Sequence, residues 1–561
     1  MPVRMLGSRA VATVAINGHP VPLTVDSGAF FSVLTEAAAT QLDLRTRSMP
    51  GLRVEGIAGA MDARVTTVEK LQLIKGDIPR VDFLVGGNEP GAGTMGLLGR
   101  NLLSFTDTEY DLANGVIRLS FPSDDCKKAN LAYWAGAAHV TELNLEPEYR
   151  SRSKTPPLRV RVKLNGSEVV ALLDTGATTI VTLRSARRAG INDAQMMPLP
   201  AIYGVGRGTA KAWTAPFERV EIGDEAISNN RLPVGDFSVD DGEMLLGIDF
   251  FLSHRIYVSK AQDKLFITYN GGTVFALNRS NGTGPPPASV EAAASGGAEA
   301  LTPDQLARRG AASAARREFD RALDDLNQAI ALDATSAAHL AQRGLVLEAL
   351  KRPGEAMADF EKAIALDPGQ TDARFARAML RLGNKDREGA QADLDLLDKT
   401  LAPQAQLRLA MSSVYLRIEQ PARAIVQLNQ WLPAHPDEVK RHSALNGRCW
   451  ARALLGVELD KALDDCNDAI DAEPRNAAYL DSRGWVHLRL GQNREAIADF
   501  DRALALRPAM PGALYGRGLV KTRVGEAAKG GEDLAAARSA EPDIERRLAR
   551  IGLVPDLRPK P

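Results

Sequence analysis

Two aspartates stand at the ends of apolar runs, where a charge is costly unless a neighbour compensates it. Asp26 ends the run "VPLTV" and Asp174 ends the run "VVALL", and in both places a hydroxyl residue and a glycine follow at once. A carboxylate at the end of a buried strand therefore needs a specific reason to be there. An aspartate before Ser-Gly or Thr-Gly is also an ordinary turn former, so one copy alone indicates little.

The surroundings of the two aspartates repeat. Asp26 lies 73 residues before Gly99 of "LLGRNLL", and Asp174 lies 73 residues before Gly247 of "LLGIDFF". Each half also has a glycine-rich segment roughly midway, namely Gly56, Ile57, Ala58 and Gly59 in the first and Gly204, Val205 and Gly206 in the second. The repeat indicates two related halves with one aspartate each.

Amino-acid composition and the positions of Gly, Asn and Pro divide the chain into five parts. Short apolar and β-branched runs between Gly, Asn and Pro predict strands in two regions. The stretch "NRSNGTGPPPASVEAAASGGAEA" is typical of a flexible linker, and an Ala-, Leu-, Arg- and Asp-rich helical pattern follows it. We expect a first β domain, a connector, a second β domain, a linker and a helical array at residues 8–122, 123–157, 158–277, 278–301 and 302–555.

The C-terminal part repeats with a period of 34 residues. The segments "EAMADFEKAIALDP" and "EAIADFDRALALRP" are close copies, and Ala322, Ala356 and Ala390 follow one another at this period. These segments resemble the second helix of the tetratricopeptide repeat (TPR), which implies an all-α solenoid of stacked helix pairs. About seven repeats and a C-terminal capping helix are expected, with starts near residues 303, 337, 371, 405, 443, 477 and 511.

The two β-rich halves resemble retropepsin-type aspartic protease domains. The resemblance rests on the triplets that begin with Asp26 and Asp174 and on "LLGRNLL" and "LLGIDFF", and it covers roughly 230 residues. It implies two all-β acid protease domains, related by a pseudo-twofold axis, that build one catalytic aspartate dyad within a single chain. A site built between two chains is the less favoured alternative, since both halves are present here, and an oligomer stays possible.

The residues around the dyad have expected roles. Ser27 and Thr175 are expected to lock the two loops together through their hydroxyl groups, and Gly28 and Gly176 to let the backbone approach the carboxyl groups. The midway glycine segments are expected to be flaps with apolar tips that close over an extended peptide. The predicted function is that of an aspartic endopeptidase, in which the dyad activates a water molecule and no covalent intermediate forms. A catalytically silent peptide-binding scaffold with the same fold is the alternative.

Other functions find little support in the sequence. The net charge of −1 argues against a nucleic-acid partner, and no run of 18 apolar residues predicts a membrane span. No clustered metal ligands are found, and the one Gly-x-Gly-x-x-Gly match, at residues 91–96, lacks the βαβ context of a dinucleotide site, so no metal or cofactor is expected. The concave face of the repeat array is expected to bind a protein partner, although such an array can also be a spacer or a dimer surface.

The cysteines bear on the cellular compartment. Cys449 and Cys466 lie 8 residues before and 9 residues after Val457, where the two helices of one repeat are expected to turn. A disulfide between them is plausible and would indicate an oxidising compartment, but cysteine also fills small core positions well. A disulfide would leave Cys126 unpaired. No signal peptide is visible, so a periplasmic or secreted location, which is favoured because bacterial proteins of this layout are often exported, and a cytoplasmic location both stay open.

Overall fold

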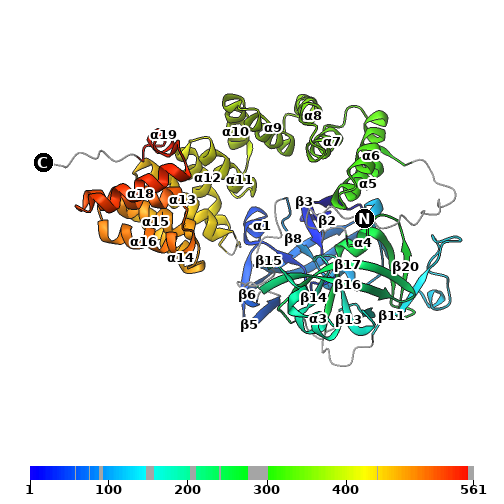
Figure 1. Cartoon of the computed structure of the whole chain (residues 1–561). Coiled ribbons are helices and arrows are strands. Elements are labelled where there is room, and N and C mark those ends of the chain that lie inside the picture. The colour runs from blue at the N-terminus through cyan, green and yellow to red at the C-terminus, as the bar shows by residue number, and fades with distance from the viewer. Residues whose placement is uncertain are drawn as a thin grey trace. The chain divides into compact units, whose positions relative to one another are not determined.

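The structure is a computed structural model, and it divides into the units Met1–Asp393 and Leu394–Pro561, each of which is described by itself. The first unit holds both β-rich halves and the first helices of the array (Figure 1). The residues that the structure describes are 1–56, 59–74, 76–86, 93–146, 157–202, 210–238, 242–275, 301–436, 438 and 440–553.

The first half is one eight-stranded sheet in the order β1-β2-β3-β8-β4-β7-β6-β5, and an additional pairing of β2 with β6 folds it back on itself. Strand β2 buries Ala10, Val11 and Ala12 in succession, so this part of the strand is covered on both faces. Its elements are β1 (Arg4–Leu6), β2 (Arg9–Ile16), β3 (His19–Val25), β4 (Val33–Leu34), α1 (Glu36–Gln41), β5 (Thr46–Gly56), β6 (Gly59–Leu73), β7 (Gly76–Val85), β8 (Gly96–Leu98) and α2 (Arg100–Leu103).

The second half repeats this topology strand for strand. Its seven-stranded sheet has the order β12-β13-β18-β14-β17-β16-β15, with an additional pairing of β12 with β16, so that only a counterpart of β1 is missing among the described residues. Its elements are β12 (Arg159–Leu164), β13 (Ser167–Asp174), β14 (Ile180–Thr182), α3 (Leu183–Arg188), η3 (Asp193–Gln195), β15 (Met197–Ile202), β16 (Ala210–Ile222), β17 (Glu225–Gly235), β18 (Met244–Gly247) and α4 (Ile248–Ser253).

A five-stranded sheet in the order β10-β9-β19-β20-β11 joins the two halves. Its centre is the antiparallel pair of β9 and β19, in which Tyr110 lies opposite Ile256, so equivalent strands of the two halves meet there. The edge strand β11 comes from the connector, which therefore takes part in holding the halves together. The remaining elements of this region are β9 (Asp107–Asp111), η1 (Leu112–Asn114), β10 (Val116–Ser120), η2 (Asp124–Lys127), β11 (Thr141–Asn144), β19 (His254–Ser259) and β20 (Lys264–Tyr269).

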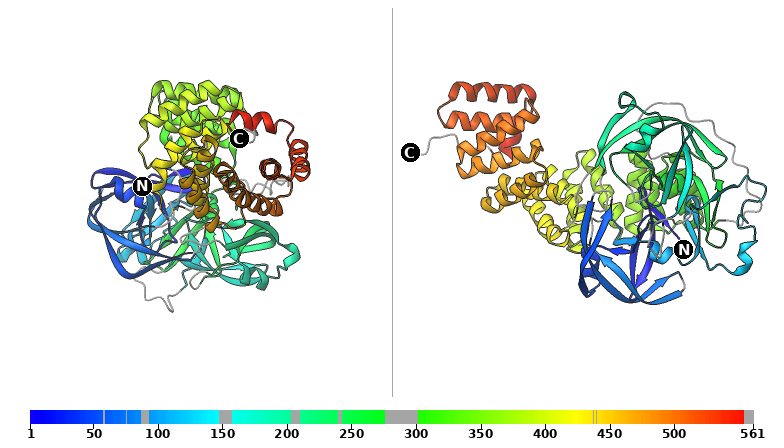
Figure 2. Two further views of the ribbon diagram at one scale, coloured as in Figure 1. Left: turned by 90° about the vertical axis from the view of Figure 1, so that its left-hand side faces the viewer. Right: turned by 90° about the horizontal axis from the view of Figure 1, so that it is seen from below.

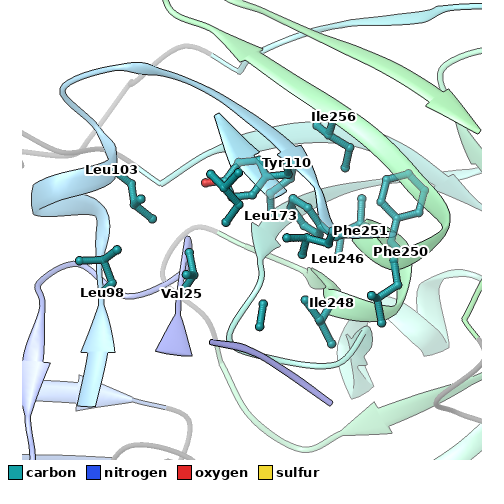
Figure 3. Close-up of a cluster of buried hydrophobic side chains, with 14 of the residues drawn as sticks. Val25, Leu98, Leu103, Tyr110, Leu173, Leu246, Ile248, Phe250, Phe251 and Ile256 are labelled. Atoms are coloured by element: carbon teal, nitrogen blue, oxygen red, sulfur yellow. The ribbon is translucent and has the colours of Figure 1, made fainter. Parts of the chain in front are cut away.

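One hydrophobic core runs through both halves. The rings of Tyr110 and Phe251, one from each half, meet edge to face with their centroids 5.1 Å apart. Each large side chain buried in this way stabilises the fold by about 1.5–3 kcal/mol, which favours the paired arrangement over separate halves. Figure 3 shows this shared cluster, with the labelled side chains Val25, Leu98, Leu103, Tyr110, Leu173, Leu246, Ile248, Phe250, Phe251 and Ile256.

The first helix pair of the array packs on the β-rich body. Helix α5 (Pro303–Ala315) contacts β1 and η1, and its Ala312 is buried in the core of the protease halves. Arg316, directly after α5, donates a hydrogen bond to the carbonyl of Leu252 in α4. The array therefore begins as a part of the protease unit.

The rest of the array consists of further antiparallel helix pairs. A Cβ on Gly344 would lie 2.5 Å from the ring of Phe360, and one on Gly484 would lie 2.7 Å from the ring of Phe500, so the small residue of the first helix admits a large one from the second. Among the described residues the array has seven helix pairs and a last helix, α19, which can be followed by colour in Figure 2. The bounds are α6 (Phe319–Leu332), α7 (Ala337–Ala349), α8 (Pro353–Leu366), α9 (Thr371–Gly383), α10 (Arg387–Thr400), α11 (Leu407–Arg417), α12 (Pro421–Ala434), α13 (Arg441–Leu455), α14 (Leu459–Ala472), α15 (Ala477–Leu490), α16 (Asn493–Leu506), α17 (Pro511–Arg523), α18 (Ala527–Ala540) and α19 (Ile544–Arg550).

None of the described helices combines the length and the apolar character that crossing a membrane requires.

Candidate active site

Parallel strand pairs carry the two aspartates to the same place. In the first half β3 runs parallel to β8, and the N–H of Asp26 donates to the carbonyl of Leu98 at 3.0 Å. In the second half β13 runs parallel to β18, with Asp174 opposite Gly247. Each aspartate thus stands where a buried strand turns into a loop.

The two loops cross so that each glycine lies against the aspartate of the other half. A Cβ built on Gly28 would lie 2.3 Å from Cγ of Asp174, and one built on Gly176 would lie 2.3 Å from Oδ2 of Asp26. A side chain at either glycine would therefore displace the opposite carboxyl group. The structure brings Asp26, Asp174 and the two glycines together at one site.

The hydroxyl groups of Ser27 and Thr175 also cross between the halves. Each accepts a hydrogen bond from the other residue's backbone N–H, at 3.0 Å in both directions. Ser27 donates its hydroxyl to the carbonyl of Leu173 at 3.0 Å, and Thr175 donates to the carbonyl of Val25 at 2.7 Å. Both hydroxyl residues are almost completely buried, so these four hydrogen bonds fix the spacing of the loops.

Backbone N–H groups hold the carboxyl groups in place. Oδ1 of Asp26 accepts from Gly28 at 2.9 Å and from Ala29 at 2.7 Å, and Oδ1 of Asp174 accepts from Gly176 at 2.8 Å. The two carboxyl groups also share a hydrogen bond with each other. Part of each aspartate still reaches the surface, as a group that acts on a substrate must.

Burial raises the pKa of both carboxyl groups. At Asp26 the hydrogen bonds from Ala29 and Gly28 and the positive charge of Arg100 oppose this rise, and at Asp174 the hydrogen bonds from Gly176 and Ala177 oppose it while the negative charge of Asp26 adds to it. The arrangement therefore favours one proton that the two carboxyl groups share as a pair.

A second set of hydrogen bonds supports the loops from behind. In the first half the Ser32 hydroxyl donates to Oδ1 of Asn101 at 2.7 Å and accepts from the N–H of Gly99 at 2.9 Å. In the second half the Thr179 hydroxyl donates to Oδ1 of Asp249 at 2.6 Å and accepts from the N–H of Gly247 at 2.9 Å.

The roles of these four polar residues were not predicted from the sequence. Ser32 lies 69 residues before Asn101, and Thr179 lies 70 residues before Asp249. This is nearly the spacing that revealed the internal repeat, so the same alignment could have found both pairs.

The glycine segments predicted to be flaps lie only partly within the described residues. Gly56 and Gly59 are paired where β5 turns into β6, and Ile57 and Ala58 between them lie outside the described residues. In the second half the pairing of β15 with β16 extends to Ile202 and Ala210, and Gly204, Val205 and Gly206 lie outside the described residues. Their role as flaps stays a prediction.

Apolar side chains accompany both loops. Phe31 and Val33 pack with Val65 and Leu84 in the first half. Ala177, which follows the second triplet, packs with Ile202 and Phe237 beside Leu172, Ile180 and Leu245.

The cysteines lie far along the chain from the dyad. Cys449 and Cys466 are joined by a disulfide between α13 and α14, with Cα atoms 5.6 Å apart, and Cys126 is a free, half-buried thiol. Within the described part of the chain no group of His, Cys, Asp or Glu side chains could hold a metal ion.

Family models match both β-rich halves and the helical array. The family model described as "gag-polyprotein putative aspartyl protease" matches residues 12–104 and again residues 160–253, and two tetratricopeptide-repeat models match residues 309–381 and 477–509. No curated protein matches the chain.

Solved structures of TPR proteins are similar to the helical part. YrrB, whose structure is described as that of a TPR protein with an unusual peptide-binding site, is 19% identical with a TM-score of 0.31, and the match covers 34% of this chain and 97% of that chain. A TPR protein of Parabacteroides merdae is 17% identical with a TM-score of 0.33, and the match covers 45% of this chain and 98% of that chain. PilF of Pseudomonas aeruginosa is 18% identical with a TM-score of 0.31, and the match covers 38% of this chain and 94% of that chain. The family matches and the observed architecture show that the chain consists of two tandem retropepsin-like aspartyl protease domains followed by an array of tetratricopeptide repeats.

Proposed function

We propose that the chain is an aspartic endopeptidase whose Asp26 and Asp174 form one intramolecular catalytic dyad. The observation that carries this proposal is the crossed contact in which each glycine of one triplet lies against the aspartate of the other. An arrangement that only needed to turn the chain would not require two carboxyl groups to face each other at the cost of their desolvation.

The proposed reaction starts from a dyad that carries one proton. The ionised carboxyl group takes a proton from a water molecule held between Asp26 and Asp174. The protonated carboxyl group polarises the scissile carbonyl. A tetrahedral diol then forms and collapses, and no acyl-enzyme is needed.

The proposed reaction has a defined pH range. The dyad is active while it carries a single negative charge, so activity falls when a second proton binds and when the last proton leaves. Because the pKa of Asp174 is raised well above that of an ordinary aspartate, the proton stays on the dyad above the pH at which a free aspartate ionises. We expect a bell-shaped profile of kcat/KM in which the pair, not either residue alone, sets the two limits.

We propose that the repeat array recruits a protein partner or substrate. Its recurring arginines are paired within the array, which argues against a free basic surface for nucleic acid. The pairs join the two helices of a repeat: Arg309–Asp325, Arg343–Asp359, Arg377–Asp393, Arg448–Asp465, Arg483–Asp499 and Arg517–Asp533.

Cleavage of a mixed peptide library between pH 3 and 7.5 tests the proposed activity. We expect the wild-type full chain to cleave, and Asp26→Asn and Asp174→Asn each to lose at least about 100-fold in rate, because each carboxyl group acts as a proton donor or acceptor. Asp43→Asn is the matched control, since Asp43 is an exposed carboxylate that follows α1 in the same half as Asp26.

The outcomes separate the proposals. Loss in both dyad variants but not in the control supports one intramolecular site. If equal mixtures of the two dyad variants regain activity, the site forms between chains. If wild type binds peptides at every pH but never cleaves them, the chain is a peptide-binding scaffold and the proposal is wrong.

A further inference from the structure

The short helix α4 lies directly behind the second catalytic loop. Its first residue, Ile248, donates its backbone N–H to the carbonyl of Ala177 at 2.8 Å. Oδ1 of its second residue, Asp249, accepts from the backbone N–H of Thr179 at 2.9 Å and from the hydroxyl of Thr179 at 2.6 Å. All six residues of α4 are buried, so a shift at the far end of this helix is transmitted to the loop that carries Asp174.

A residue of the repeat array holds the far end of α4. The guanidinium group of Arg316, which directly follows α5, donates a hydrogen bond to the carbonyl of Leu252. The last carbonyls of a helix have no partner within it, so this donor satisfies a buried acceptor. Arg316 is 5% exposed, and its Nη2 donates to the carboxylate of Glu318 at 3.0 Å. Glu318 also accepts from the backbone N–H of Thr273 at 3.2 Å, so the charge of Arg316 is compensated where it is buried.

Apolar packing accompanies the contact of Arg316 with α4. Ala312 of α5 is fully buried in the same hydrophobic cluster as Phe250 and Leu252 of α4. Phe275, which follows the last strand of the second half, is 3% exposed and stacks on Phe250 with the ring centroids 6.3 Å apart. The burial of Ala312 and the contacts of α5 with β1 and η1 therefore keep Arg316 in a fixed position.

The corresponding helix of the first half is held differently. Helix α2 ends at Leu103, whose carbonyl accepts from the hydroxyl groups of Thr106 and Thr108, at 3.3 Å in both cases. These hydrogen bonds come from the same half, whereas the hydrogen bond of Arg316 to α4 comes from the array. The two catalytic loops thus have different support although their own hydrogen bonds are equivalent.

We propose that Arg316 is a positioning residue for Asp174, because it fixes α4 and α4 fixes the second catalytic loop. The inference deepens the proposed peptidase function and rests on it for the effect on the rate. The first helix pair of the array is then a required part of the catalytic unit. A change at the end of α5 alters turnover and leaves the surfaces that hold the peptide as they are.

Steady-state kinetics and hydrogen–deuterium exchange of the full chain test this role. Arg316→Met removes the donors and keeps an unbranched side chain, and Arg316→Lys keeps one charged donor group. Arg343→Met is the matched control, because Arg343 forms an ion pair with Asp359 within the second repeat. Each variant is compared with wild type at a temperature at which both are folded.

The two measurements have defined expected results. We expect Arg316→Met to lower kcat for a library peptide by at least about ten-fold, because a small misplacement of a catalytic group is costly. KM should stay within about two-fold, since only the arrangement of the dyad changes. Arg316→Lys should recover a part of kcat, and Arg343→Met should match wild type.

Hydrogen exchange locates the effect in one loop. In Arg316→Met the backbone amides of Thr179 and Gly247, which are bonded to Asp249 and Thr179, should exchange faster than in wild type. The amides of Ser32 and Gly99 are their counterparts in the first half and should exchange as in wild type.

The inference is overturned if Arg316→Met keeps the kcat of wild type, which would mean that Arg316 only fastens the array. Equal acceleration of exchange in both loops would also overturn it, because Arg316 would then stabilise the whole protease unit. If Arg316→Met does not fold, the same two measurements on Arg316→Lys decide, since a lysine cannot form the paired contacts of an arginine. Exchange needs no turnover, so faster exchange confined to the second loop of a chain that never cleaves would sustain the positioning role and reject the peptidase. Cleavage at the same rate in wild type and variant would do the reverse.

Discussion

The first and second protease halves share their framework but differ at several positions in and behind the catalytic loops. Strand order, the glycine-to-aspartate contacts, the crossed hydroxyl groups and the hydrogen bonds behind the loops recur in both halves. The differences include two adjacent pairs of equivalent positions, Arg100 against Ile248 and Asn101 against Asp249. The loops also differ in length, because Ser32 lies six residues after Asp26 whereas its equivalent Thr179 lies five residues after Asp174. The shared features hold the dyad, while the diverged positions lie where a duplicated site can become asymmetric.

Alanine at the two triplet glycines gives the largest expected effect. The added Cβ of Gly28→Ala would lie 2.3–2.6 Å from the atoms of the Asp174 carboxyl group. The added Cβ of Gly176→Ala would lie 2.3–2.8 Å from those of the Asp26 carboxyl group. The carboxyl group must move, and a misplacement of about 1 Å costs on the order of 100-fold in rate. We expect both variants to lose at least that much in kcat with the library peptides.

Equal losses at the two glycines are the sign of a symmetric dyad. If one variant keeps normal kcat while the other is inactive, the two halves do not contribute equivalent carboxyl groups. Circular dichroism and gel filtration of both variants serve to separate a displaced carboxyl group from an unfolded chain.

Removal of the crossed hydroxyl groups comes next. Ser27→Ala leaves the N–H of Thr175 and the carbonyl of Leu173 unpaired, and Thr175→Val leaves the N–H of Ser27 and the carbonyl of Val25 unpaired. A buried unpaired polar group costs about 1–3 kcal/mol, so each variant, with two such groups, should lower the free energy of unfolding of the protease unit by about 2–6 kcal/mol. Urea unfolding followed by tryptophan fluorescence measures both.

The double variant sharpens this comparison. Both hydroxyl groups tie the same two loops, so the cost in the double variant should be less than the sum of the single costs. Strict additivity would mean that the halves are held together elsewhere, chiefly by the five-stranded sheet.

Asp249, which lies behind the second loop, is expected to make the free energy of unfolding depend on pH, and the first loop has no such acid. Burial raises the pKa of Asp249, and its equivalent, Asn101, does not ionise. The folded protein therefore binds the proton more tightly than the unfolded chain, and this stabilising contribution is complete at pH values below the usual pKa of 3.8 and is lost as the pH rises through the raised pKa.

Asp249→Asn should abolish that contribution, and Asn101→Asp should introduce a second one. The free energy of unfolding of Asp249→Asn should improve relative to wild type with rising pH, with a slope of at most about 1.4 kcal/mol per pH unit. Thermal unfolding between pH 3.5 and 8 measures the slope. A difference that does not vary with pH would show that Asp249 keeps the same charge in the folded and unfolded chains.

The sequence predicted the parts of the site that are local. A strand that ends in Asp-Ser-Gly or Asp-Thr-Gly already carries the acid, the hydroxyl and the glycine within three residues, so the duplication was enough to predict both triplets. The predicted fold class, with two β-rich halves and a TPR array, is confirmed. It could be predicted because short apolar runs between Gly, Asn and Pro and a 34-residue period can be recognised directly along the chain.

What the sequence did not reveal depends on contacts across long separations. Residues 123–157 were predicted only as a connector, yet β11 within them completes the sheet between the halves, because it pairs with β20, 120 or more residues later. Arg100 was part of a recognised segment, but its burial, at 8% exposure, depends on residues far along the chain and is not encoded by a local pattern.

The smallest effect is expected from making the two triplets identical. Ser27→Thr adds one methyl group at a residue that is 1% exposed and keeps the hydroxyl that bonds to Leu173 and Thr175. The equivalent methyl of Thr175 is accommodated in the second half at the same 1% exposure, so the added group should cost less than about 1.5 kcal/mol in unfolding free energy. The pH profile of kcat/KM should keep its shape, since neither carboxyl group gains or loses a donor. A cost as large as that of Ser27→Ala would mean that the two loops, although equivalent in their hydrogen bonds, are packed against different surroundings, and that the symmetry of the halves ends at the hydroxyl groups.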